Sequence, residues 1–203
     1  MEPIRLFASR ANIYRILADC FKYPDPSLAD ILELIPAQKG WGLSAELENE
    51  LDRLPGLFHV DSSGFQEIEL EYTRLFVGPY HVPASPYSSV YLDPEPMVMG
   101  ISTLEAIDFY ERAGLNPDEN EHVLPDHIST ELEFMYYLLF QYVSQNNPDF
   151  MAMAESFFSR HLGQWGPTFA ELVLKNARHP YYQKLGQVLA LFFAECTGRP
   201  PLN

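Results

Sequence analysis

Acidic and histidine side chains gather between residues 126 and 133, where the sequence reads DHISTELE. Glu131 lies four residues after His127, so the two side chains share one face if this segment is a helix. A histidine and a carboxylate placed in this way could hold a metal ion or orient an imidazole for proton transfer. A structural role is the alternative, with Asp126 capping the helix and Glu131 complementing its dipole. In a third interpretation, Asp126 and His127 border a groove in which a peptide docks on the free N–H groups of the helix start.

The rest of the sequence gives little support to catalysis. We find no third ligand at a comparable spacing, and the motifs GxxxxGK[ST], GxGxxG, GxSxG and HExxH are absent. The sequence therefore contains no motif that supports nucleotide hydrolysis, dinucleotide binding, serine hydrolysis or zinc proteolysis. A metal-dependent enzyme centred on His127 and Glu131 stays the alternative function, and no cofactor is expected.

Composition limits the partners that the protein can have. Its 203 residues include 13 Lys and Arg against 28 Asp and Glu, a formal net charge of −15 at pH 7. Such a surface repels phosphate backbones and anionic membranes and attracts a basic partner, so nucleic-acid binding is not expected. Arg5, Arg10 and Arg15 interrupt the apolar residues of the N-terminus, which predicts a cytoplasmic protein without a signal peptide there. Cys20 and Cys196 form no zinc or redox motif and are predicted to be buried thiols.

An aromatic segment, residues 71–91, follows a helical pattern that carries Tyr72, Leu75 and Phe76. Gly78 and Pro79 end that helix, because proline lacks the N–H group and disfavours a helical residue before it. The loop that follows is rich in proline and tyrosine, although connecting segments are usually polar. Two interpretations are compatible: the loop packs back on the core, or it presents a stiff aromatic surface to a partner.

Helical periodicity predicts an all-α fold, a single domain over residues 1–203, with the polar segment 116–124 as a possible hinge or lobe boundary. Trp41 and Trp165, both beside a glycine, are expected to cover the edge of the core. The predicted helices cover about 4–23, 25–34, 44–54, 63–76, 102–114, 127–142, 149–161, 167–177 and 180–196.

Capping signals set several of these boundaries. Asp25 and Asp126 are the predicted N-caps of their helices, and Ser63 and Ser102 each have Gln or Glu three residues later, as in a capping box. Gly114 is the predicted residue after a helix C-terminus. A loop without regular structure is expected from Gly78 to Gly100, and a linker from Pro36 to Gly42.

Three long stretches resemble a known family. They are LFVGPYHVPASPYSSVYLD at 75–93, PDHISTELEFM at 125–135 and HLGQWGPTFAELVLKNARHPYYQKLG at 161–186. In this order they are similar to the TorD/DmsD branch of the NarJ-type chaperones, and the similarity extends from about Ala11 to Leu191. The resemblance implies an all-helical cytoplasmic protein that is not an enzyme. It would bind the twin-arginine leader, and in some members the mature part, of an apo-reductase of the dimethyl sulfoxide or trimethylamine N-oxide class, and keep it from export until its molybdenum cofactor is inserted.

The resemblance also implies a peptide-binding surface and an oligomeric state. Some relatives are domain-swapped dimers, so a monomer or such a dimer is expected. Guanine nucleotides have been proposed as ligands of relatives, although this chain lacks a phosphate-binding glycine loop. Tryptophan is usual in the DmsD branch where Tyr72 and Tyr80 stand here, and tyrosine is usual where Lys22 stands, so the client of this protein is expected to differ. The residues carried over are Tyr72, Leu75, Phe76, Tyr80, Gly100, Asp126 and His127.

A twin-arginine leader combines two guanidinium groups with an apolar stretch. Its recognition requires an apolar groove with negative potential, because carboxylates bind arginine through charge-assisted hydrogen bonds. The candidate partners for the leader arginines are Glu71, Asp126, Glu131 and Glu133.

Overall fold

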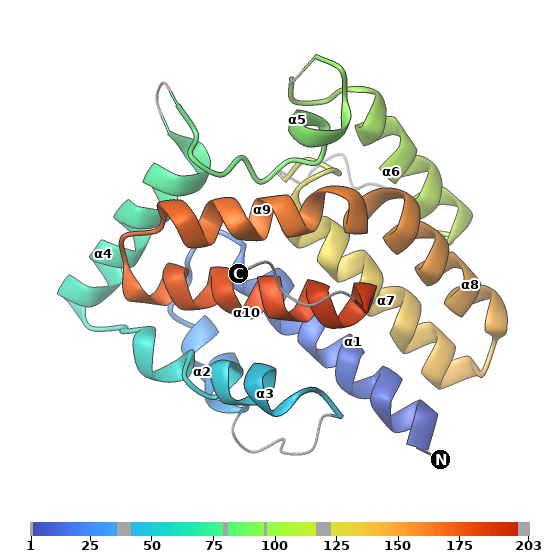
Figure 1. Ribbon diagram of the computed structural model, residues 1–203, viewed down its shortest axis with the longest axis horizontal. Coiled ribbons are helices and arrows are strands. Elements are labelled where there is room, and N and C mark those ends of the chain that lie inside the picture. Colours follow the sequence, from blue (N-terminus) through green and yellow to red (C-terminus); the bar gives the residue numbers. More distant parts are fainter. Residues whose placement is uncertain (1, 36–41, 79–80, 96, 117–122, 199–203) are drawn as a thin grey trace. The chain divides into compact units, whose positions relative to one another are not determined.

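The described part of the chain is helical. The computed structural model describes residues 2–35, 42–78, 81–95, 97–116 and 123–198, and side chains from residue 6 onward. Within these ranges there is no strand, only an isolated antiparallel bridge between Tyr87 and His127, so the all-α prediction is confirmed. The elements drawn in Figure 1 are α1 (Glu2–Cys20), α2 (Leu28–Glu33), α3 (Ala45–Leu51), α4 (Ser62–Tyr72), α5 (Ser89–Leu92), α6 (Ile101–Arg112), α7 (Ile128–Gln145), α8 (Pro148–Phe157), α9 (Gly163–Asn176) and α10 (Pro180–Thr197), with a 3-10 turn η1 (Pro55–Leu57) and π-helical turns η2 (Thr73–Val77) and η3 (Phe158–Leu162).

The chain forms two compact units, each made from segments that are distant in sequence. The first unit consists of Met1–Asp19 and Pro86–Gly166, and the second of Cys20–Ser85 and Pro167–Asn203. Both ends of the predicted hinge at 116–124 belong to the first unit, and residues 117–122 of it lie outside the described residues. The single-domain organisation and the hinge stay predictions.

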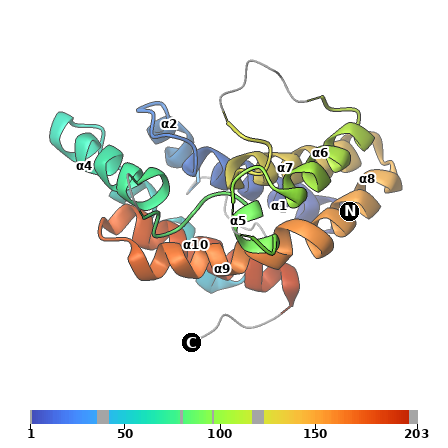
Figure 2. The ribbon, with the colours of Figure 1, turned by 90° about the horizontal axis from the view of Figure 1, so that it is seen from above.

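The first unit is organised around α7. Apolar residues recur along this helix at the spacing of one face, and Ile128, Leu132 and Met135 are buried. Helix α8 packs against α7, where the ring centroids of Phe134 and Phe157 are 4.9 Å apart at nearly a right angle. Figures 1 and 2 both show α6, α7 and α8 next to one another. The polar residues singled out above lie just before α7 and in its first turn.

The second unit is organised around α10. Its N-terminal half buries Tyr181, Tyr182 and Leu185 completely, and α3 packs against it. At Gly186 the helix approaches α9 so closely that a Cβ atom would lie 2.7 Å from the backbone nitrogen of Leu174. Glycine is required here because the two helix backbones would otherwise have to separate.

The two predicted capping boxes are wrong. Helix α4 begins at Ser62, and its cap is Asp61, whose Oδ1 accepts a hydrogen bond of 3.1 Å from the N–H of Gly64. Helix α6 begins at Ile101, and the carboxylate of Asp93 accepts a 3.0 Å hydrogen bond from the N–H of Ser102. In both cases an aspartate before the predicted serine already accepts the free N–H group, so the serine is not needed as a cap.

Other boundaries also differ from the predictions. The first helix ends at Cys20, and the third ends at Leu51 instead of at 54. Helix α2 begins at Leu28, because the carboxylate of Asp25 accepts the N–H of Ser27 (2.9 Å) in the turn before it. Helix α9 begins at Gly163, so Pro167 lies inside it.

The predicted loop from Gly78 to Gly100 contains a short helix, α5, and Gly114 follows the end of α6 with a φ of 80°, as expected. Cys20 is buried, whereas Cys196 is partly exposed. The linker at 36–42 lies outside the described residues except for Gly42, and Trp41 lies outside them too. None of the helices in the described ranges has both the length and the apolarity needed to cross a membrane.

Candidate functional site

A buried polar cluster in the first unit connects the residue before α5 with α7, η3 and the start of α9. Its members are Ser88, Glu131, His161 and Trp165, which we call the Glu131 cluster. The Nε2 atom of His161 on η3 lies 2.9 Å from one oxygen of Glu131, and the indole N–H of Trp165 donates a 2.9 Å hydrogen bond to the other. The hydroxyl of Ser88 lies 3.1 Å from the same histidine nitrogen. All four side chains are removed from solvent.

Burial and mutual hydrogen bonding shift the pKa values of the two ionisable groups in this cluster, Glu131 and His161. Burial raises the pKa of Glu131, while the hydrogen bonds from His161 and Trp165 act in the opposite direction. Burial also opposes a charged imidazole, but the hydrogen bond and the charge of Glu131 outweigh it and raise the pKa of His161. The protonation of either group therefore depends on that of the other. The cluster joins the start of α7 to η3 and α9.

Asp126 has a different role from the predicted one. Its Oδ2 atom accepts hydrogen bonds from the backbone N–H of Ser89 (3.2 Å) and from its hydroxyl (2.6 Å). Its carbonyl accepts the N–H of Ser88, and the N–H of Ile128 donates to the carbonyl of Pro86. Asp126 therefore caps the first residue of α5 instead of α7, because segment 86–89 runs alongside it and supplies the donors.

His127 is the N-cap of α7. Its Nδ1 atom accepts a 3.2 Å hydrogen bond from the N–H of Ser129 and lies 2.7 Å from the hydroxyl of that residue. Burial lowers the pKa of His127 to about 4. The neutral ring is the form that the cap requires, since a protonated Nδ1 could not accept a hydrogen bond. The ring centroids of Tyr87 and His127 are 5.3 Å apart, in an edge-to-face arrangement.

Gly100 lies beside the same short helix. A Cβ atom on Gly100 would come within 1.6 Å of Oδ2 of Asp93 and within 3.5 Å of Cβ of Ser89. Asp126 contacts Ser89 as well, so the structure brings Gly100, Asp126 and His127 together around the start of α5. These three residues of the predicted surface support the segment and have little exposed side chain of their own.

Tyr72, Leu75 and Phe76 lie together in the second unit and are buried. The side chain of Tyr72 is the most exposed of the three, at 6%. Its ring centroid is 5.1 Å from that of Phe76, and its hydroxyl donates a 3.4 Å hydrogen bond to the carbonyl of Phe21. Phe76 also packs against Tyr182 of α10. Tyr80, the remaining residue of the predicted surface, lies outside the described residues.

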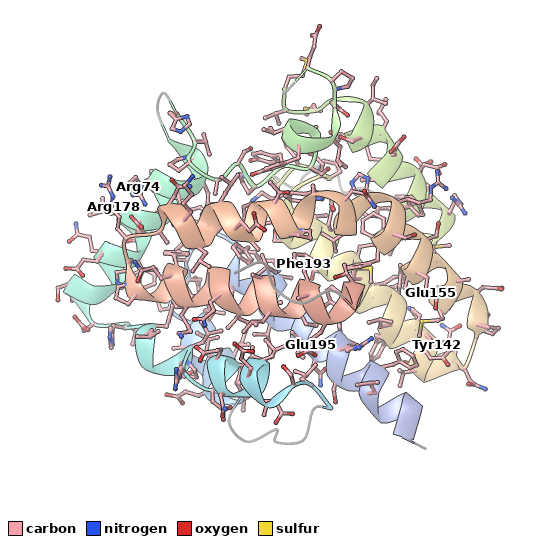
Figure 3. All side chains as sticks on the ribbon, in the orientation of Figure 1. Arg74, Tyr142, Glu155, Arg178, Phe193 and Glu195 are labelled. Carbon is pink, nitrogen blue, oxygen red and sulfur yellow. The ribbon has the colours of Figure 1, made fainter. Side chains whose placement is uncertain are left out.

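The four carboxylates suggested as partners of leader arginines already have partners in this chain. Glu71 accepts two hydrogen bonds from Arg74 and one from the N–H of Arg178, two residues labelled in Figure 3. Glu133 pairs with Arg15 at 2.6 Å. Asp126 and Glu131 are fully buried. Of the four, Glu133 has the most exposed side chain, at 40%.

The metal-enzyme alternative has no geometric support. The carboxylate of Glu131 is directed to His161 and Trp165, while Nδ1 of His127 faces Ser129. In the described ranges no three His, Cys, Asp or Glu side chains are grouped so that they could hold a metal ion.

Two members of the Glu131 cluster, Trp165 and His161, differ from what the sequence indicated. Trp165 is completely buried instead of lying at the edge of the core. Its indole N–H group can be buried because it donates a hydrogen bond to Glu131. His161 ends the helix predicted at 149–161, and nothing in the sequence indicated that its partner is Glu131. The available signal was the four-residue spacing of His161 and Trp165 in the third family-like stretch, which puts both on one helical face. The serine pair at 88–89 carried no sequence signal.

The chain belongs to the nitrate reductase delta subunit family, whose model matches residues 42–171. It is 29% identical over 187 residues to a Tat proofreading chaperone DmsD of Salmonella typhi, covering 89% of this chain and 85% of that protein. It is 30% identical to a probable Tat proofreading chaperone DmsD of Haemophilus influenzae, covering 86% and 83%. The solved structure of a putative redox enzyme maturation protein from Archaeoglobus fulgidus matches with a TM-score of 0.60 at 26% identity, over 92% of this chain and 93% of that one. The relatives are thus named as proofreading chaperones, and the solved structure as a redox enzyme maturation protein.

Proposed function

We propose that this protein is a cytoplasmic chaperone of redox-enzyme maturation. It binds the twin-arginine leader of an apo-molybdoenzyme of the dimethyl sulfoxide or trimethylamine N-oxide reductase class. It holds that client until the molybdenum cofactor is inserted, before export. The observation that carries the proposal is the match, over 89% of the chain, to a protein named as a Tat proofreading chaperone.

The charge of the protein supports a basic partner. A net charge of −15 attracts a leader with two adjacent arginines and raises its rate of encounter. The apolar part of the leader would supply most of the affinity, as it does when apolar segments dock in grooves.

The leader-binding residues in the first unit are Gly100, Asp126 and His127. Because these residues are buried or nearly so, we assign them a supporting role: they hold segment 86–89 and the start of α6 in place for their exposed neighbours. The residues proposed in the second unit are Tyr72, Leu75 and Phe76, with Tyr80. Binding of the mature part of the client, and a monomeric or domain-swapped dimeric state, belong to the same proposal.

Co-expression with a client precursor tests the function. The chain is produced with a reductase of this class that carries its leader, and with the same reductase lacking the leader. We expect a complex to be isolated only with the leader-bearing form, and the molybdenum content of the reductase to fall when the chaperone is omitted. Equal recovery of both forms would assign recognition to the mature part. No complex with either form and no change in molybdenum content would contradict the proposal.

A further inference from the structure

Large apolar side chains are exposed in the first unit just before and within the first turn of α6. They are Met97, Val98, Met99, Ile101 and Leu104, and we call them the 97–104 patch. Their exposed fractions run from 42% for Val98 to 68% for Ile101. Scattered apolar residues on a surface are normal, but a contiguous group of this kind marks an interaction site.

The backbone beneath the patch is held in a defined shape. Asp93 accepts the N–H of Ser102, and α5 packs against α6. Gly100 leaves the space that the Asp93 carboxylate occupies, and Met99 has a left-handed φ of 64°. A methionine in this conformation costs about 1 kcal/mol and persists only where the surroundings impose it. The patch is thus presented on a preformed support, which lowers the entropic cost of binding.

Acidic side chains border the patch. Glu95 precedes it, and Glu105 follows Leu104 on the same exposed face of α6 as Ile101. Both carboxylates are exposed, whereas Asp108, one turn further along, is paired with Arg112 at 3.5 Å. The surface therefore combines an apolar centre with exposed carboxylates at its edge.

An apolar surface bordered by carboxylates favours a binding partner that is both apolar and basic. A second copy of the chain would bring the same carboxylates against each other and add a second charge of −15. An anionic membrane would be repelled for the same reason. We propose that the 97–104 patch binds the apolar stretch of the client leader, with the adjacent leader arginines at Glu95 and Glu105. This inference rests on the proposed function and deepens it, because it names the surface that contacts the leader.

Titration calorimetry with a leader peptide tests the patch. The variant Ile101→Ser/Leu104→Ser removes two exposed apolar side chains of the patch. Leu34→Ser serves as the control outside the patch. Leu34, the C-cap residue of α2, is 59% exposed, which is similar to the 67% of Leu104. We expect the double variant to bind at least about tenfold more weakly, since burying a leucine contributes about 1.5–3 kcal/mol. The control should bind like wild type. Far-UV circular dichroism and thermal melting confirm that both variants are folded.

A second variant tests the charges. Glu95→Gln/Glu105→Gln should weaken binding at low salt, and its difference from wild type should disappear at high salt as the charges are screened.

The outcomes separate the two proposals. If wild type binds the leader and the patch variant binds equally well, the patch inference fails and the proposed function stands. If wild type binds no leader, both fail. If the patch variant keeps its affinity but changes the molar mass in light scattering, the patch is a self-association surface and the inference is overturned.

Discussion

The neutral ring of His127 is the most consequential single-residue feature of the first unit. It accepts the first free N–H group of α7 from a buried position, next to Asp126, which caps α5. Two neighbouring residues thus fix the starts of two helices. A substitution that removes either acceptor should lower the stability of the protein and also change the conformation of segment 86–89.

Acid should destabilise the protein through His127. Its folded pKa is about 4, below the unfolded value of about 6.5, so its contribution to stability is complete above pH 6.5 and is lost as the pH falls toward 4. Between pH 7 and pH 5 this amounts to about 2 kcal/mol. Urea unfolding at both pH values checks this. His127→Asn, which keeps a capping side chain, should remove that part of the pH dependence.

The exposed histidine His81 supplies the control for this prediction. His81→Asn should leave the pH dependence of the wild type in place. An unchanged difference between pH 7 and pH 5 in His127→Asn would show that another group is responsible.

Two glutamates on α7 should differ strongly in their contribution to stability. Glu131→Ala leaves His161 and the indole N–H of Trp165 without their acceptor in a buried site, which costs about 3–5 kcal/mol. Glu133→Ala breaks a partly exposed pair with Arg15 and should cost less than about 1 kcal/mol. Chemical denaturation of both variants measures the difference, and similar losses would contradict the assignment of the Glu131 cluster.

The sequence indicated Asp126 and His127 as important residues but not their partners. Aspartate before a helical pattern is the usual sign of an N-cap, and here the donors of Ser89 compete for it. Such competition depends on the path of a loop distant in sequence. The same holds for Glu131, which pairs with a residue 30 positions away instead of with His127 on its own helix.

At the scale of elements, the contact between α9 and α10 depends on one glycine. Gly186→Ala places a Cβ atom 2.7 Å from the backbone of Leu174, so the helices must separate. We expect a loss of about 1–3 kcal/mol in the free energy of unfolding. Gly56→Ala is the control, because a Cβ atom there meets no other atom within 4 Å. Equal stability of the two variants would contradict the close packing.

The sequence predicts helices correctly where their apolar periodicity is strong. It misplaces helix boundaries where the choice of the capping residue determines the start. Helix α10 was predicted to within one residue of its end, since Pro180 marks its start and a continuous apolar pattern follows. The starts of α4, α6 and α9 depend on which side chain or turn supplies the first acceptors, and local sequence offers several. The helix α5 has only four residues and no periodicity that could reveal it.

At the scale of the whole molecule, net charge should control how fast a leader binds. With a charge of −15, association with a twin-arginine peptide should slow by about tenfold or more between 50 mM and 500 mM salt. Stopped-flow fluorescence measures this rate. A peptide with both arginines replaced by glutamine should show little salt dependence, and equal slopes for the two peptides would exclude electrostatic steering.

Calorimetric titration with a twin-arginine leader from a reductase of this class tests whether this protein binds such a leader. The controls are the same peptide with both arginines replaced by alanine and a peptide with its apolar stretch scrambled. We expect saturable binding of the leader at one site per chain, and we expect both control peptides to lose it. If the heats of the leader and of its controls are indistinguishable for several such leaders, this protein does not recognise twin-arginine leaders.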